Sequence, residues 1–114
     1  MAERRAIYRV DEARIWTVKT NPLGLSIAVA GAASTPKWSE FELTPAVYVM
    51  PPADGIYDIF WTGLPPDEIV PEVLTPVEFA WTWIGFPETH LKGVRVHSDT
   101  NVVEALLDHS REPA

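Results

Sequence analysis

The chain has 114 residues, of which 46% are hydrophobic and 22% are charged, and this balance suits one compact globular domain rather than a disordered tail. It contains no cysteine, which excludes disulfides, thiol catalysis and cysteine-based zinc sites. The formal net charge is −7, and the stretch from Trp38 to Leu91 has no Lys or Arg but nine Asp and Glu residues. Such a stretch would repel phosphate backbones, so nucleic acid is not an expected partner.

Membrane and export signals are not evident in the sequence. No segment approaches the roughly 18 consecutive apolar residues of a membrane-spanning helix. The first residues, MAERRAIYRVDEAR, lack the apolar run of a signal peptide. We therefore expect a cytoplasmic protein without membrane contact, with a single domain over residues 1–114 whose ends, 1–5 and 109–114, are frayed.

Short β-strands are the regular structure that the sequence predicts. Eleven prolines interrupt the chain, and between Pro22 and Pro87 they fall too densely for a long helix. In chain order, the segments expected to be strands are residues 14–19, 25–30, 46–50, 56–61, 77–83 and 94–97. The alternation is clearest in residues 77–83, whose odd-numbered members are all large and apolar and share one face of an extended chain.

The C-terminal segment has two interpretations. Asn101 could cap a short helix, with Glu104 three residues further on. Alternatively, residues 99–101 form a tight connection and residues 102–107 pair with residues 94–97 as a hairpin. We favour the hairpin, because isolated short helices are marginal and a strand edge lies close by in sequence. The regular spacing of short strands then predicts an all-β fold: a single-domain antiparallel β-sandwich, immunoglobulin- or fibronectin-like in shape, with about seven strands and little or no helix.

Metal and catalytic sites find little support in the sequence. His97 and Asp99 are weak metal candidates, because residues two apart share one face of a strand. However, the chain has no close His pair, and a solvent-facing His97 with Asp99 starting a turn fits the strand interpretation equally well. No G-x-S-x-G elbow and no glycine-rich phosphate loop occurs. We expect no enzymatic activity, no catalytic residue, no cofactor and no resident metal.

Asp58 is the acidic residue of greatest interest. If the residues on either side of it face the core, Asp58 points outward between Ile56 and Phe60, on an unusually apolar outer face. That face either binds a partner or is covered from within, with Asp58 bonded to backbone or to an arginine such as Arg9 or Arg14.

Trp38 lies in a polar stretch, residues 34–40, that is expected to be a loop. Either the ring is exposed, where it could stack on a sugar or anchor a protein, or it folds back as a plug over one end of the sandwich.

Together these features predict a non-enzymatic protein-interaction module with an acidic, aromatic-containing surface. Its partner would be a second copy of itself or another protein, as for an inhibitor or immunity-type protein that neutralises a basic partner. The interaction candidates are Trp38, Ile56, Asp58 and Phe60. The alternative is a β-sandwich that binds a small ligand or carbohydrate, and a small enzyme that uses Asp and His is the third possibility.

Overall fold

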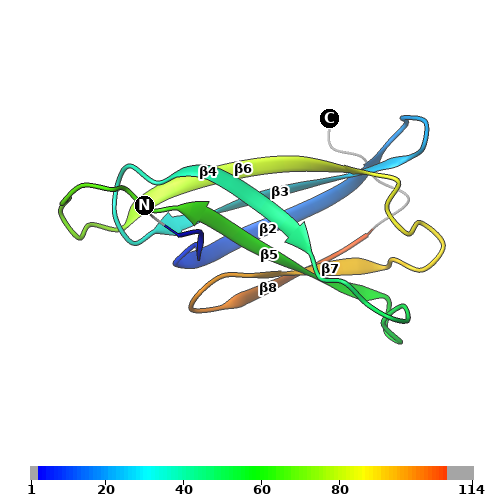
Figure 1. Cartoon of the computed structure of the whole chain (residues 1–114). Coiled ribbons are helices and arrows are strands. Elements are labelled where there is room, and N and C mark those ends of the chain that lie inside the picture. The colour runs from blue at the N-terminus through cyan, green and yellow to red at the C-terminus, as the bar shows by residue number, and fades with distance from the viewer. Residues whose placement is uncertain (1–2, 108–114) are drawn as a thin grey trace.

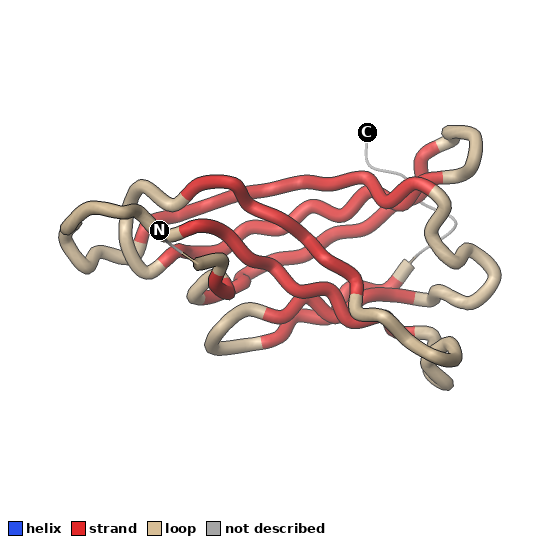
Figure 2. The backbone as a smooth tube through the Cα atoms, in the orientation of Figure 1, coloured by secondary structure: helices blue, strands red, loops and turns tan. Residues whose placement is uncertain are grey.

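A computed structural model of the protein describes residues 3–107, in which every regular element is a β-strand (Figure 2). Eight strands form two sheets that pack against each other around one core (Figure 1). The all-β sandwich predicted from the sequence is confirmed, with eight strands where about seven are expected. Within residues 3–107 no helix is long and apolar enough to cross a membrane.

The larger sheet has five strands and the smaller sheet has three. In chain order the strands are β1 (Arg5–Ala6), β2 (Arg9–Val18), β3 (Gly24–Ala33), β4 (Ser39–Pro45), β5 (Ile56–Leu64), β6 (Thr75–Ile84), β7 (Gly93–His97) and β8 (Val102–Leu106). In the larger sheet β5 pairs with β1, β4 and β7, and β7 pairs with β8. In the smaller sheet β3 lies between β2 and β6. The expected fraying of residues 1–5 and 109–114 falls mostly outside the described residues, although Arg5 belongs to β1.

One strand pair departs from the expected antiparallel arrangement. All pairs are antiparallel except β5 and β7, which run parallel from Ile56–Gly93 to Phe60–His97. After β5 the chain forms β6 in the other sheet and then returns at β7, so it enters the larger sheet in the direction of β5. A sheet crossover of this kind permits parallel pairing, whereas a direct hairpin does not.

The strand expected at residues 46–50 is absent, and this prediction is wrong. The preceding residues form β4 instead, so the predicted loop at residues 34–40 also ends earlier than expected. Val47 and Val49 are almost fully exposed, while Tyr48 turns back onto the protein. A β-branched, alternating run resembles a strand in sequence. Its backbone follows β5 only as far as Ala46, whose N–H donates to Asp58 O, because the N–H of Asp58 bonds the Tyr48 hydroxyl and not a backbone carbonyl.

The core lies between the two sheets, and β5 contributes to it as the alternation predicts. Tyr57, Ile59 and Trp61 are buried, and Asp58 and Phe60 point to the opposite face. The largest fully buried side chains are Trp61, Ile7, Leu25, Ile27, Ile59, Val10, Val94 and Val96. The inward-facing residues of β6 are only half buried, because β6 forms the border of its sheet.

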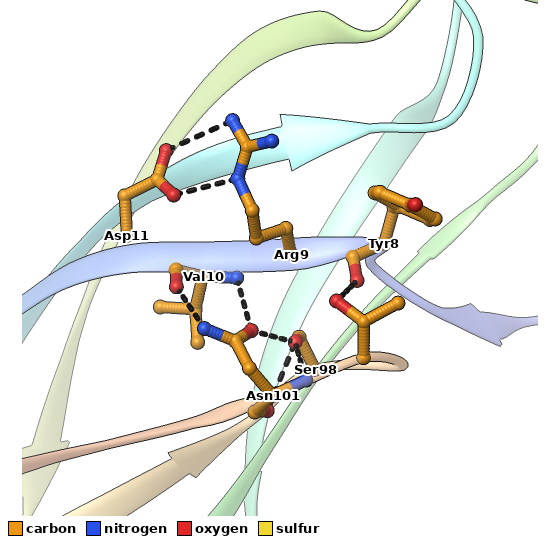
Figure 3. Close-up of polar contacts among 7 residues, drawn as sticks. Tyr8, Arg9, Val10, Asp11, Ser98 and Asn101 are labelled. Carbon is orange, nitrogen blue, oxygen red and sulfur yellow. Dashed lines mark hydrogen bonds and ion pairs between the residues drawn. The ribbon is translucent and has the colours of Figure 1, made fainter.

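The hairpin of β7 and β8 is confirmed, and its turn fastens the two sheets together. Asn101 does not cap a helix; its amide bonds both backbone groups of Val10 (Figure 3). Val10 N donates to Asn101 Oδ1 at 3.0 Å, and Asn101 Nδ2 donates to Val10 O at 2.7 Å. Two further bonds run from Asp99 N and Thr100 N to the carbonyls of residues 7 and 8. The side-chain amide thus satisfies both backbone groups of Val10, next to the bulge in β2.

Candidate functional site

The outer face of the larger sheet carries a set of side chains that we call the β5–β7–β8 face. The strand register places its residues in two rows, Phe60–His97–Val102 and Asp58–Arg95–Glu104, with Leu106 beyond them opposite Gly93. Because successive side chains of a strand point to opposite faces of the sheet, these positions of β5, β7 and β8 all point outward. The face therefore combines a charged row with apolar side chains.

Asp58 is the centre of a hydrogen-bonded cluster on this face. The Tyr48 hydroxyl donates to Asp58 Oδ2 at 2.5 Å, and His97 Nε2 lies 2.7 Å from Asp58 Oδ1. The Tyr48 oxygen also accepts the backbone N–H of Asp58 at 3.0 Å, which ties the loop after β4 to β5. The expected arginine partners, Arg9 and Arg14, bond elsewhere, to Asp11 and Glu12.

These contacts shift the pKa values of Asp58 and Tyr48. The hydrogen bond from Tyr48, followed by that with His97, holds the pKa of Asp58 below its ordinary value. Partial burial, followed by the bond to Asp58, raises the pKa of Tyr48. Asp58 therefore stays a carboxylate at neutral pH and Tyr48 stays a donor.

Arg95 lies among three carboxylates in the next part of the face. Its guanidinium bonds Asp54 at 2.6 Å and lies 3.5 Å from Glu104 and 3.9 Å from Asp58. Asp54 also accepts the backbone N–H of Ile56 at 2.9 Å, and this bond, followed by Arg95, lowers the pKa of Asp54. One cation among three anions leaves this part of the face net negative at neutral pH.

The apolar part of the face is solvent-exposed. Phe60, Val102 and Leu106 are 42%, 49% and 64% exposed. The Phe60 ring lies 5.1 Å from the His97 ring, at an interplanar angle of 30°. Ile56, an interaction candidate from the sequence, lies on the same side of β5 as Asp58 and Phe60 but is only 7% exposed. A Cβ on Gly93 would meet both Ile56 and Leu106, so these two side chains cover Gly93 together. Ile56 therefore belongs to this face but offers a partner little contact area.

Comparison with known proteins adds nothing to this geometry. No protein-family model, curated protein or solved structure matches the chain. Its function is therefore inferred from its own side chains.

The two weak metal candidates are not brought together. His97 bonds Asp58, whereas Asp99 is exposed in the β7–β8 turn, where its backbone N–H donates to Ile7 O. Residues 3–107 contain no group of three or more His, Asp or Glu side chains that could hold a metal ion. In this part of the chain, His97 and Asp58 form an oriented imidazole–carboxylate pair on an open sheet face.

Trp38 lies apart from the β5–β7–β8 face. It is half buried against the core, and its indole N–H donates to Thr35 Oγ1 at 3.0 Å. It also lines a surface hollow of about 380 Å³ together with Tyr8 and Asp99. Small-ligand binding at Trp38 stays a prediction.

Sequence reasoning missed Tyr48 and Arg95 as members of the cluster. Tyr48 was missed because its segment was assigned to a strand. The alternation of that segment nevertheless places Tyr48 on the opposite side from Val47 and Val49, as the structure does. Arg95 and His97 alternate with two valines in the predicted strand at 94–97, which was a usable signal for a shared outward face. What the sequence could not supply was the pairing of that strand with β5.

The cluster predicts a specific pH dependence of stability. Asp58→Asn should lower the free energy of unfolding by about 1.5 kcal/mol near neutral pH, because it removes a carboxylate that accepts charge-assisted bonds. Folding lowers the pKa of Asp58. The stabilisation by its carboxylate is therefore fully present at a pH above the unfolded-state pKa of ~3.9, and it is lost as the pH falls through the lower pKa of the folded state. Urea unfolding of both chains across acidic pH should therefore show the gap closing.

Asp67→Asn is the matched control, because Asp67 is an exposed acid in the loop between β5 and β6. It should leave stability almost unchanged at every pH. If the difference in unfolding free energy between the wild type and Asp58→Asn stays constant below pH ~3.9, the charge of the Asp58 carboxylate is not the cause of the stabilisation.

Proposed function

We propose that the chain is a protein-binding module and that the β5–β7–β8 face is its contact surface. The observation that carries the proposal is the exposure of Phe60, Val102 and Leu106 beside an ordered charged row on one continuous sheet face. Exposed apolar side chains grouped with polar side chains on one face are typical of protein interfaces.

The charge of the face indicates the kind of partner. Asp54, Asp58 and Glu104 surround the single guanidinium of Arg95. In addition, β5 and the loops on either side of it lie within the stretch from Trp38 to Leu91 that has no Lys or Arg. A partner with apolar side chains flanked by Lys or Arg complements this face, and its association would be accelerated by electrostatic attraction.

The order of the face also favours binding. Tyr48 and Asp54 come from the loop between β4 and β5, and their bonds hold Asp58 and Arg95 in place. Side chains that are fixed before binding lose less conformational entropy when a partner docks. The inhibitor or immunity-type role expected from the sequence is one form of such a module.

The test is affinity capture from cell extract with the wild type and with Leu106→Asp. Leu106 is exposed, so the variant should fold, and a carboxylate there would disrupt the apolar contact. We expect a basic protein that the wild type retains to be retained at least about tenfold less by Leu106→Asp, the equivalent of about 1.4 kcal/mol. Retention by the wild type should also fall as salt is raised.

Val73→Asp is the matched control. Val73 is 58% exposed, close to the 64% of Leu106, but it lies in the loop between β5 and β6. This variant should retain the partner like the wild type. If Leu106→Asp retains the partner as well as the wild type does, the proposal is contradicted. It is contradicted as well if Leu106→Asp and Val73→Asp both fail to retain the partner.

A further inference from the structure

The smaller sheet has one long border that is unpartnered in the described residues, the outer edge of β6. Strand β6 makes ten consecutive register pairs with β3, from Gly24–Ile84 to Ala33–Thr75, without a bulge. Figure 1 shows β6 along the upper border of the molecule, with β3 below it. No backbone bond from another strand in residues 3–107 reaches the outer edge of β6.

The other sheet borders are short or irregular, whereas β6 is long and regular. Strand β2 has a bulge after Val10 and is fastened there by Asn101. Strand β4 has a register shift, with Glu40 at a φ of 49°. Strand β8 has only five residues. Proteins commonly protect sheet edges with bulges, charges, prolines or short strands. Strand β6 carries Pro76 and Glu78 near its start but has no bulge, Lys or Arg, so the rest of its edge is an available pairing surface.

The inward-facing side chains of β6 add apolar surface along this border. They are half buried and are Val77, Phe79, Trp81 and Trp83. The two tryptophan rings stack at 6.0 Å, and Trp83 meets Tyr57 edge-on at 6.2 Å. The core covers these rings from one side, which leaves area that a strand added beside β6 would bury.

We propose that β6 pairs with β6 of a second copy of the chain, antiparallel about a two-fold axis at Ala80. The two three-stranded sheets would then form one continuous six-stranded sheet. Directly opposed residues of an antiparallel pair point to the same side, so the axis must pass through a residue and not between two residues.

The residue pattern of β6 is self-complementary about Ala80. On the outer face, Glu78 comes opposite the partner's Thr82 instead of opposite its own copy. The Thr82 hydroxyl already lies 2.9 Å from Ser26 Oγ; it can accept from Ser26 and donate to the partner's Glu78. On the inner face, Phe79 comes opposite the partner's Trp81. An aromatic cross-strand pair of this kind stabilises a sheet, and no like charges are opposed.

The second copy is favoured as occupant because the strand complements itself in charge and in side-chain type. This inference goes beyond the proposed function and does not depend on it, since the β5–β7–β8 face belongs to the other sheet and stays free. A dimer would present two such faces, and a multivalent partner would then bind more tightly.

The experiment is light scattering of purified protein during size-exclusion chromatography, over a concentration series. The wild type should be a dimer, and Ala80→Lys should dissociate at least about tenfold more readily, because two ammonium groups meet at the axis. Ala80 is exposed, so the variant should fold. An equimolar mixture of Ala80→Lys and Ala80→Glu should form a heterodimer, which tests the register directly.

Val102→Lys is the matched control, since Val102 is an exposed residue on β8, the border strand of the other sheet. It should stay dimeric, as should Leu106→Asp, so a failure of this inference is distinguishable from a failure of the proposed function. A wild type that is monomeric at the highest attainable concentration would overturn the inference. A dimer unaffected by Ala80→Lys would overturn it as well.

Discussion

Replacement of Asn101 by alanine should lower the free energy of unfolding by about 3 kcal/mol, because a buried backbone donor and a buried backbone acceptor lose their partners. Val10 is fully buried, and the Asn101 amide bonds both its N–H and its carbonyl. The same amide oxygen accepts from the Ser98 hydroxyl, which keeps the turn in shape. In thermal unfolding the loss corresponds to a midpoint lower by roughly 10–20 °C.

Thr100→Ala is the control for this prediction. Thr100 belongs to the same turn, and its hydroxyl donates to Tyr8 O at 2.7 Å in an exposed hydrogen bond. The backbone N–H of Thr100 donates to the same carbonyl, and that bond remains in the variant. The expected loss is about 1 kcal/mol or less. Similar losses for Thr100→Ala and Asn101→Ala would argue against the bidentate contact as the link between the sheets.

Replacement of Gly31 by alanine should cost at least about 3 kcal/mol, the upper range for overpacking of a buried position. A Cβ on Gly31 would overlap the carbonyl oxygen of Arg9, and it would lie 2.9 Å from the Cα of Val10. Both contacts are with backbone, so β2 must move away from β3 to relieve them. Chemical denaturation of the purified variant measures the loss, and failure to fold is its extreme form.

Gly24→Ala is the matched control, because Gly24 is a buried glycine of the same strand. A Cβ there would meet only side chains, with Val18 nearest at 2.9 Å, and side chains can rotate away. We expect a loss of about 1 kcal/mol, within the range for modest overpacking. A Gly31 variant as stable as the Gly24 variant would contradict the close approach of the two strands.

The Asn101→Ala and Gly31→Ala changes should also be coupled. Gly31 pairs with Val10, the residue that Asn101 binds, so the displacement of β2 in the Gly31→Ala variant would already weaken the Asn101 contact. The loss in the double variant should therefore be smaller than the sum of the single losses.

The sequence by itself determined the class of the fold and the direction of many side chains. Strand periodicity is local: residues two apart share a face, so the large apolar positions of residues 77–83 had to point one way. The same rule placed Asp58 and Phe60 outward and Tyr57 inward, as the structure confirms. The hairpin of residues 94–107 could be predicted because its two strands are joined by a short turn.

Only the tertiary structure decided which strands are neighbours. Asn101 and Val10 are 91 residues apart in sequence, and Asp58 and His97 are 39 apart. Such contacts follow from the order of strands in each sheet and from how the two sheets pack, and the period of a single strand determines neither. For the same reason residues 46–50 resembled a strand in sequence: alternation describes a chain that could pair, but the backbone bonding of this segment to β5 ends at Ala46.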